Sequence, residues 1–151
     1  MKPTTPEAAA APRLADFLCF AVYSANLAFG RAYRPILDEL GLTYPQYIAI
    51  VALWEEDDQT VSRLGEKLFL ESNTLTPILK KLESMGYLTR RRNPKDERQV
   101  RVNLTEAGRR LREKGLTMNL IKQTRLPPEE FAKLQKAVSN LRDSLMEAVG
   151  E

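Results

Sequence analysis

Two features of this sequence limit the chemistry that its side chains can perform: it contains a single cysteine and no histidine. Without histidine the chain has no imidazole to act as a general base, to complete a catalytic triad or to bind a metal. A structural zinc site needs several thiolates or imidazoles, so one cysteine cannot form such a site within one chain. These absences exclude histidine-dependent catalysis and histidine-ligated metals. We predict no catalytic residues, no metal site and no cofactor, and that the protein is not an enzyme.

The single thiol, Cys19, lies in a long apolar segment next to Phe20. Because cysteine is among the residue types most often buried, its simplest interpretation is a small hydrophobic core residue. Tyr23 follows four residues later, so it lies on the same helical face one turn away. Tyr33 lies fourteen residues on, about 21 Å along a straight helix. A contact between Cys19 and Tyr33 would thus require a second copy of the chain running in the opposite direction.

Positive charge is concentrated in one segment. Between Thr60 and Arg112 there are 13 Lys and Arg against 6 Asp and Glu, a net charge of +7, whereas the whole chain carries only +3. A basic stripe on a nearly neutral chain is typical of a surface that binds a polyanion such as DNA, and a merely solvated charged face is the alternative.

This basic segment contains the pattern of two helices separated by a break. The first spans residues 61–69, and Ser72 is suited to cap the second. The second helix turns one apolar face to a core, with Leu75, Ile78, Leu79, Leu82 and Met85. Its opposite face is polar, and we predict that it contacts DNA through Ser72, Asn73, Thr74, Thr76, Lys80 and Lys81. Pro77 is too far along to be a first-position proline, so the helix either begins later or bends. Gly86 is suited to end it.

A β-hairpin follows the second helix. Val100, Val102 and Leu104 alternate with polar residues, the period of a half-buried strand, and Pro94 and Asp96 are turn formers. The hairpin is cationic, and we predict DNA contacts from Arg90, Arg91, Arg92, Lys95, Arg98 and Arg101. Residues 59–61 could add a third strand. Two helices followed by a basic hairpin predict a mainly α-helical fold with a small β-wing, a winged helix-turn-helix.

Helices are predicted on both sides of this unit. Residues 14–40 form a helix that is apolar on most of its circumference, which indicates a partner subunit. Gly30 and Pro35 predict a kink or break within it. A helix from 106 to about 123, capped by Thr105, and a last helix from Pro128 complete the chain. We predict one domain over residues 1–151, in which residues 14–42 and 106–149 form a helical dimerisation lobe and residues 43–105 the winged lobe.

The segment between the first long helix and the basic segment begins with a helix-capping signal and ends in an acidic run. Residues 43–46 form a capping box that begins a helix to about Glu56, with Tyr47, Ile48, Val51, Ala52 and Trp54 predicted on its core face. The acidic run at 55–58 is interpreted as a solvated loop without a role.

The wing carries a specific resemblance. DER at residues 96–98 and VRVNLTEAG at residues 100–108 resemble the wing of MarR-type transcriptional regulators. This resemblance covers nearly the whole chain and implies a homodimer that binds a pseudo-palindromic double-stranded operator. It also implies that Arg98 enters the minor groove and that Asp96 holds it through an ion pair.

A second resemblance concerns the thiol. LCFAVY at residues 18–23, Tyr33, and LTYPQ at residues 42–46 are similar to the organic hydroperoxide resistance regulators within the MarR family. The resemblance implies a redox-sensing Cys19, with Tyr33 and Tyr44 as hydroxyl donors to its sulfur and Tyr23 close by. If residue 14 begins the helix, Cys19 lies in the second turn, where the helix dipole has faded, so the tyrosines must stabilise the thiolate.

The implied function is a repressor that binds its operator when Cys19 is reduced and releases it after an organic hydroperoxide has oxidised Cys19. No second cysteine exists to capture the sulfenic acid, so a low-molecular-weight thiol would be the partner of that step. The alternatives are a MarR-type repressor that binds a small phenolic or lipophilic ligand non-covalently, and a thiol-dependent peroxidase. With no apolar run of about 18 residues and no apolar leader, we expect no membrane span and a cytoplasmic location.

Overall fold

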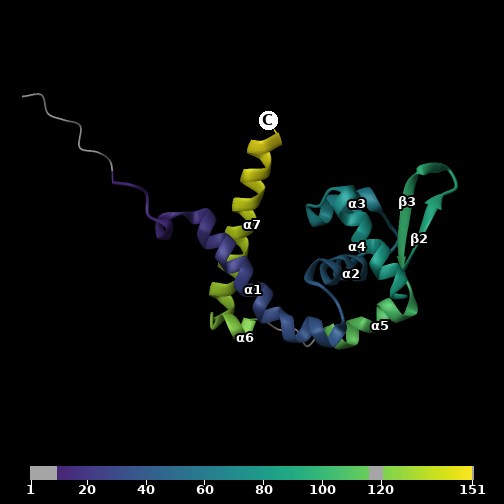
Figure 1. The fold of residues 1–151 in the computed structure, drawn as a ribbon, viewed down its shortest axis with the longest axis horizontal. Coiled ribbons are helices and arrows are strands. Elements are labelled where there is room, and N and C mark those ends of the chain that lie inside the picture. The colour runs from purple at the N-terminus through teal and green to yellow at the C-terminus, as the bar shows by residue number, and fades with distance from the viewer. Residues whose placement is uncertain (1–9, 116–120, 151) are drawn as a thin grey trace, which may run out of the picture.

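The computed structural model describes residues 10–115 and 121–150, which form helices and one small antiparallel sheet. In Figure 1 the helices α1, α6 and α7 lie to one side and the helices α2, α3 and α4 with the β-hairpin lie to the other, joined by the end of α1 and by α5. The described helices and strands are η1 (Leu14–Asp16), α1 (Leu18–Leu40), α2 (Tyr44–Glu55), β1 (Gln59–Thr60), α3 (Val61–Leu68), α4 (Ser72–Ser84), β2 (Leu88–Asn93), β3 (Asp96–Leu104), α5 (Glu106–Gly115), α6 (Ile121–Thr124) and α7 (Pro128–Gly150).

The winged helix-turn-helix predicted from the sequence is confirmed. The sheet order is β1-β3-β2, with both pairings antiparallel, so the short β1 is the predicted third strand. As the alternation predicts, Val102 and Leu104 are buried, and Leu75, Leu79 and Leu82 of α4 are buried with them. A shared core therefore fixes the orientation of α4 relative to the wing.

The helix α2 begins as predicted and buries its predicted face only in part. The Thr43 side chain accepts from the backbone N–H of Gln46, and the Gln46 side chain accepts from the Thr43 N–H, which completes the capping box. Of the predicted core face, Ala52 is buried, and Tyr47 and Trp54 are half-buried and pack against the core. The other buried residues of the helix, Ala49, Ile50 and Leu53, were not predicted. The helix is apolar on all sides, so sequence periodicity could not identify the face that packs inward.

The first long helix begins later than predicted. Leu14–Asp16 form a separate 3-10 turn, and the extended backbone of Phe17 caps α1, which starts at Leu18. Of the predicted kink or break, the break is absent, because α1 continues through Pro35 to Leu40. Its ribbon changes direction along its length in Figure 1, as a kinked helix does. Gly41, in the left-handed conformation at φ +67°, ends the helix as predicted.

The turn between α3 and α4 differs from the prediction in its cap. Glu71 is the residue before α4 and makes no side-chain cap, whereas Ser72, the predicted cap, is already the first helical residue. Pro77 lies inside α4. The turn itself is set by Phe69, which adopts the left-handed conformation at φ +57°. Gly86, at φ +82°, follows the end of α4 as predicted.

The C-terminal helices are mostly exposed. Thr105 caps α5 by accepting from the backbone N–H of Gly108, as predicted. The predicted continuation of this helix to about residue 123 crosses residues 116–120, which lie outside the described residues. The helix α7 has no buried residue, although Leu134, Val138 and Leu145 lie along it. Within the described residues, no helix has the length and apolar character needed to cross a membrane.

Candidate functional site

The polar face of α4 points away from the core. Ser72, Asn73 and Thr74 at its first turn are exposed, and so are Lys80 and Lys81. Thr76 is half-buried and donates its hydroxyl hydrogen bond to the carbonyl oxygen of Ser72 at 2.7 Å. The first turn of a helix presents free N–H groups, so this face can contact phosphates through its backbone and base edges through its side chains.

The wing adds exposed cations beside this face. Arg91, Arg92, Lys95 and Arg98 are exposed on the hairpin, and Figure 1 shows the hairpin projecting beyond the helices. The predicted ion pair between Asp96 and Arg98 is wrong. The Asp96 carboxylate instead accepts the backbone N–H of Arg98 at 3.1 Å, which shapes the turn and leaves the guanidinium exposed.

The other two predicted wing cations have partners within the chain. The Nη2 of Arg90 lies 3.1 Å from the carboxylate of Glu83 on α4, and the Arg90 backbone N–H donates to the same carboxylate at 2.9 Å. These hydrogen bonds lower the pKa of Glu83, the side-chain bond contributing most. Arg101 pairs with Asp58 at 2.9 Å, and its hydrogen bond lowers the pKa of Asp58. Arg90 therefore joins β2 to α4, and Arg101 joins β3 to the loop before β1.

The acidic run at 55–58 is the main feature that the sequence interpretation missed. Glu55 pairs with Lys67 and Glu56 with Arg63, both on α3. Asp57 accepts the backbone N–H of Leu104 at 2.9 Å, and its other oxygen lies 3.5 Å from Arg109 of α5. The run is therefore a junction that joins α2, α3, the sheet and α5. The partners of Asp57 lie 47 and 52 residues further along the sequence, so no local signal identified them.

A tryptophan strengthens the same junction. The indole Nε1 of Trp54 donates to the carbonyl oxygen of Gly108 at 2.9 Å. Gly108 is itself buried, and a Cβ at this position would lie 2.1 Å from the carbonyl oxygen of Tyr87. The start of α5 therefore packs directly on the wing, so movement of α5 would displace the sheet.

Cys19 is exposed, so within one chain it is not the core residue of the simplest interpretation. It is the second residue of α1, within the first turn, and not in the second turn as the sequence had suggested. No described side chain of the same chain forms a hydrogen bond to the Cys19 thiol, and Tyr23 is 61% exposed.

Tyr33 and Tyr44 lie together, away from Cys19. Their ring centroids are 5.2 Å apart, which places the end of α1 against the start of α2. Burial raises the pKa of Tyr33 above its ordinary value, and the neighbouring Tyr44 and Tyr47 raise it further, so Tyr33 is a neutral donor. The structure thus brings together the two predicted donors and leaves the thiol elsewhere on α1.

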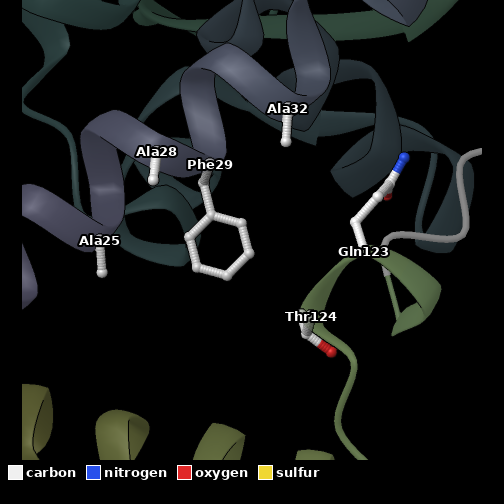
Figure 2. A pocket seen from close by; sticks show the side chains of 6 residues that line it. All are labelled: Ala25, Ala28, Phe29, Ala32, Gln123 and Thr124. Carbon is white, nitrogen blue, oxygen red and sulfur yellow. The ribbon is translucent and has the colours of Figure 1, made fainter.

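A hollow of about 230 Å³ separates α1 from α6. Figure 2 shows the Phe29 ring extending from α1 into this space, with Thr124 of α6 on the other side. The remaining lining is mainly alanine, from Ala25, Ala28 and Ala32, with Gln123. Among the described residues, no group of three or more histidine, cysteine or acidic side chains could hold a metal ion.

Comparisons with known proteins agree on the type of molecule. Residues 31–114 match the family described as transcriptional regulator SarA/Rot. The organic hydroperoxide resistance transcriptional regulator of Bacillus subtilis is 41% identical over 138 residues, which cover 88% of this chain and 92% of that protein.

Two solved structures of AbfR from Staphylococcus epidermidis are also similar. Reduced AbfR bound to DNA is 36% identical with a TM-score of 0.77, covering 91% of this chain and 95% of that one. Disulfide-formed AbfR is 34% identical with a TM-score of 0.63, covering 92% and 94%.

Proposed function

Because this chain belongs to the MarR-type family of DNA-binding transcriptional regulators, in its organic hydroperoxide resistance group, we propose that it is a repressor whose operator is released when an organic hydroperoxide oxidises Cys19. The observation that carries this proposal is the exposed thiol of Cys19 in the first turn of α1. The same helix carries Tyr33, whose ring lies against the ring of Tyr44.

The repressor acts as a homodimer. Of the 23 residues in α1, only Leu37 and Leu40 in the last turns are buried, although the helix is apolar on most sides. Large apolar side chains remain exposed along α1 and α7, at Leu18, Phe20, Val22, Leu27, Phe29, Leu134, Val138, Leu145, Met146 and Val149. Soluble monomers rarely expose an apolar surface of this extent, and a second copy of the chain would cover it.

An antiparallel arrangement of two α1 helices would complete the sensor. Cys19 and Tyr33 are about 21 Å apart along one helix, so they cannot bond within a chain. If two copies cross at Asn26, midway between them, the partner's Cys19 lies level with Tyr33 and Tyr44. The hollow beside Phe29 then lies between the two thiols, where it can admit the organic part of a hydroperoxide.

The tyrosine hydroxyls would donate to the sulfur and stabilise its negative charge. The thiolate attacks the terminal oxygen of the hydroperoxide, so that an S–O bond forms while the O–O bond breaks. Sulfur supplies the two electrons, and the alkoxide leaves as an alcohol after taking up a proton. The resulting sulfenic acid condenses with a low-molecular-weight thiol, which forms a mixed disulfide and releases water.

Oxidation would then change the spacing of the two α4 helices, one from each copy, which are the recognition helices that contact DNA. The described conformation is more similar to reduced, DNA-bound AbfR than to disulfide-formed AbfR. We take it as the DNA-binding conformation. A mixed disulfide removes the charged sulfur that the tyrosines bind and adds bulk between the α1 helices.

The experiment measures binding of the reduced protein to the DNA upstream of its own gene. It is repeated after one equivalent of cumene hydroperoxide and a small thiol, for the wild type and for Cys19→Ser. We expect oxidation to release only the wild type. Release of both proteins, or of neither, would contradict the proposal. Sustained peroxide turnover with excess thiol would instead indicate a peroxidase.

The hollow beside Phe29 favours a second candidate, a repressor that responds to a small phenolic or lipophilic ligand. This function does not need the thiol. An Ala28→Leu substitution would fill part of the hollow and weaken a response to such a ligand, while Cys19→Ser would leave that response unchanged.

A further inference from the structure

An aromatic ring and a cation join the helix-turn-helix to the last helix. The guanidinium carbon of Arg142, on α7, lies 4.2 Å from the centroid of the Phe69 ring. Phe69 is the residue that turns the chain from α3 toward α4. In Figure 1 the helix α3 lies between the hairpin and α7. The contact therefore links the segment before the recognition helix to a helix outside the winged unit.

Phe69 is an unusual residue for its position. It ends α3 in the left-handed conformation at φ +57°, where glycine or asparagine is favoured. Its side chain is 50% exposed, so the core of the winged unit does not account for it. A large aromatic side chain at a strained and exposed position indicates that the ring has a partner outside this core. Arg142 is that partner.

Arg142 is held in position by its neighbour. The Nε and Nη2 of Arg142 both donate to one carboxylate oxygen of Asp143, at 3.0 and 2.8 Å. The face of the guanidinium remains available for the ring. Planar guanidinium groups stack on aromatic faces in this way.

The turn that carries Phe69 is compact. The Leu70 backbone N–H donates to the Gly65 carbonyl oxygen at 2.9 Å, and a Cβ on Gly65 would lie 2.7 Å from the Leu70 carbonyl oxygen. Because α4 begins two residues after Leu70, a displacement of Phe69 would move the start of the recognition helix with it.

We propose that Arg142 and Phe69 are positioning residues, whose cation–π contact holds the recognition helix in its DNA-binding orientation relative to α7. This inference rests on the proposed function, in which the described conformation binds DNA and oxidation adds bulk between the α1 helices. It adds how a displacement reaches α4. A shift of α7 would withdraw Arg142 from Phe69, so that the turn before α4 could move.

A double-mutant cycle on the reduced full chain, without peroxide, tests the contact. Phe69→Leu keeps an apolar side chain and the backbone strain but removes the ring face, and Arg142→Met keeps the stem but removes the charge. Lys136→Met, which removes an exposed charge from the same helix, is the control. Affinity is measured for the upstream DNA fragment and for random DNA of equal length, together with the thermal unfolding midpoint.

We expect each single variant to bind the upstream fragment about 2- to 5-fold more weakly per contact, or about 4- to 25-fold for the two contacts of a dimer. The double variant should be no weaker than either single variant. Random-DNA affinity and the unfolding midpoint should stay close to the wild type, as should the control. Additive losses, equal losses on random DNA, or unchanged binding would overturn the inference.

The two proposals fail separately. The cycle uses only reduced protein, so it gives the same result whether or not peroxide releases the wild type. Peroxide sensitivity with an additive cycle would refute only the contact, and a coupled cycle without peroxide sensitivity would refute only the sensor.

Discussion

The location of Tyr33 relative to Cys19 can be tested with heterodimers in which each chain carries a different defect. A dimer of Cys19→Ser with Tyr33→Phe has one thiol, and that thiol faces an intact tyrosine only if the site forms between chains. A dimer of wild type with the double variant also has one thiol, which faces an intact tyrosine only if the site forms within a chain. The two heterodimers therefore contain the same number of thiols. They differ only in whether the intact Tyr33 is on the same chain as the thiol or on the partner chain.

The expected magnitude follows from the geometry. Cys19 and Tyr33 are about 21 Å apart along one helix, far beyond hydrogen-bond distance. A hydrogen bond to a charged group contributes about 1.5–3 kcal/mol, so its loss should slow oxidation of the thiol about 10- to 100-fold. We expect the Cys19→Ser and Tyr33→Phe heterodimer to react at nearly the wild-type rate per thiol and the other heterodimer to react slowly.

The assay uses two affinity tags to isolate each heterodimer, followed by trapping of the sulfenic acid at limiting cumene hydroperoxide. Mass spectrometry then gives the rate for the single thiol. The reverse order of rates would refute the antiparallel arrangement, and equal rates would show that Tyr33 does not bond to the sulfur.

Three further results are expected from the winged unit. Gly108→Ala places a Cβ against the Tyr87 carbonyl oxygen, and thermal unfolding should show a loss of about 1–3 kcal/mol or more, since no space exists for it. Glu83→Gln should destabilise the protein at neutral pH, and the difference in stability between variant and wild type should vanish in acid. The reason is that the hydrogen bonds from Arg90 lower the folded-state pKa of Glu83. Their contribution to stability is present above the unfolded-state pKa and is lost as pH falls through the folded-state pKa. Denaturant unfolding between about pH 3 and 7 measures this. Arg98→Gln should weaken binding to operator and random DNA alike and reduce the slope of affinity against salt by about 1 per chain, measured by salt titration.

Much of the fold was predictable because it depends on local signals. The capping box at Thr43 and Gln46 fixed the start of α2, and the left-handed glycines Gly41 and Gly86 marked the ends of two helices. Alternation around Val102 predicted the wing strand. Each of these signals lies within a few residues of the structure that it determines, so tertiary packing did not override it.

The remaining features depend on contacts between distant residues. Asp57 binds Arg109, and Phe69 contacts Arg142, pairs that no short motif connects. The start of α1 was misplaced because Phe17 is apolar like its helical neighbours, and only its extended backbone shows that it is the cap. This one-turn difference matters for function, since it moves Cys19 into the first turn of the helix.

The energies involved are sufficient for a switch of this kind. Lowering operator affinity by about 10³- to 10⁴-fold requires about 4–5.5 kcal/mol of differential stabilisation between the two conformations. A dimer has two thiols, and each loses two hydrogen bonds from Tyr33 and Tyr44 on oxidation in the proposed site. At about 1.5–3 kcal/mol for each bond to a charged sulfur, the lost interactions exceed the requirement even if only part of them favours the DNA-binding conformation. The Arg142–Phe69 contacts, at about 0.5–1 kcal/mol each, are too weak to drive release. They can pass on the displacement, but the thiols must supply the energy.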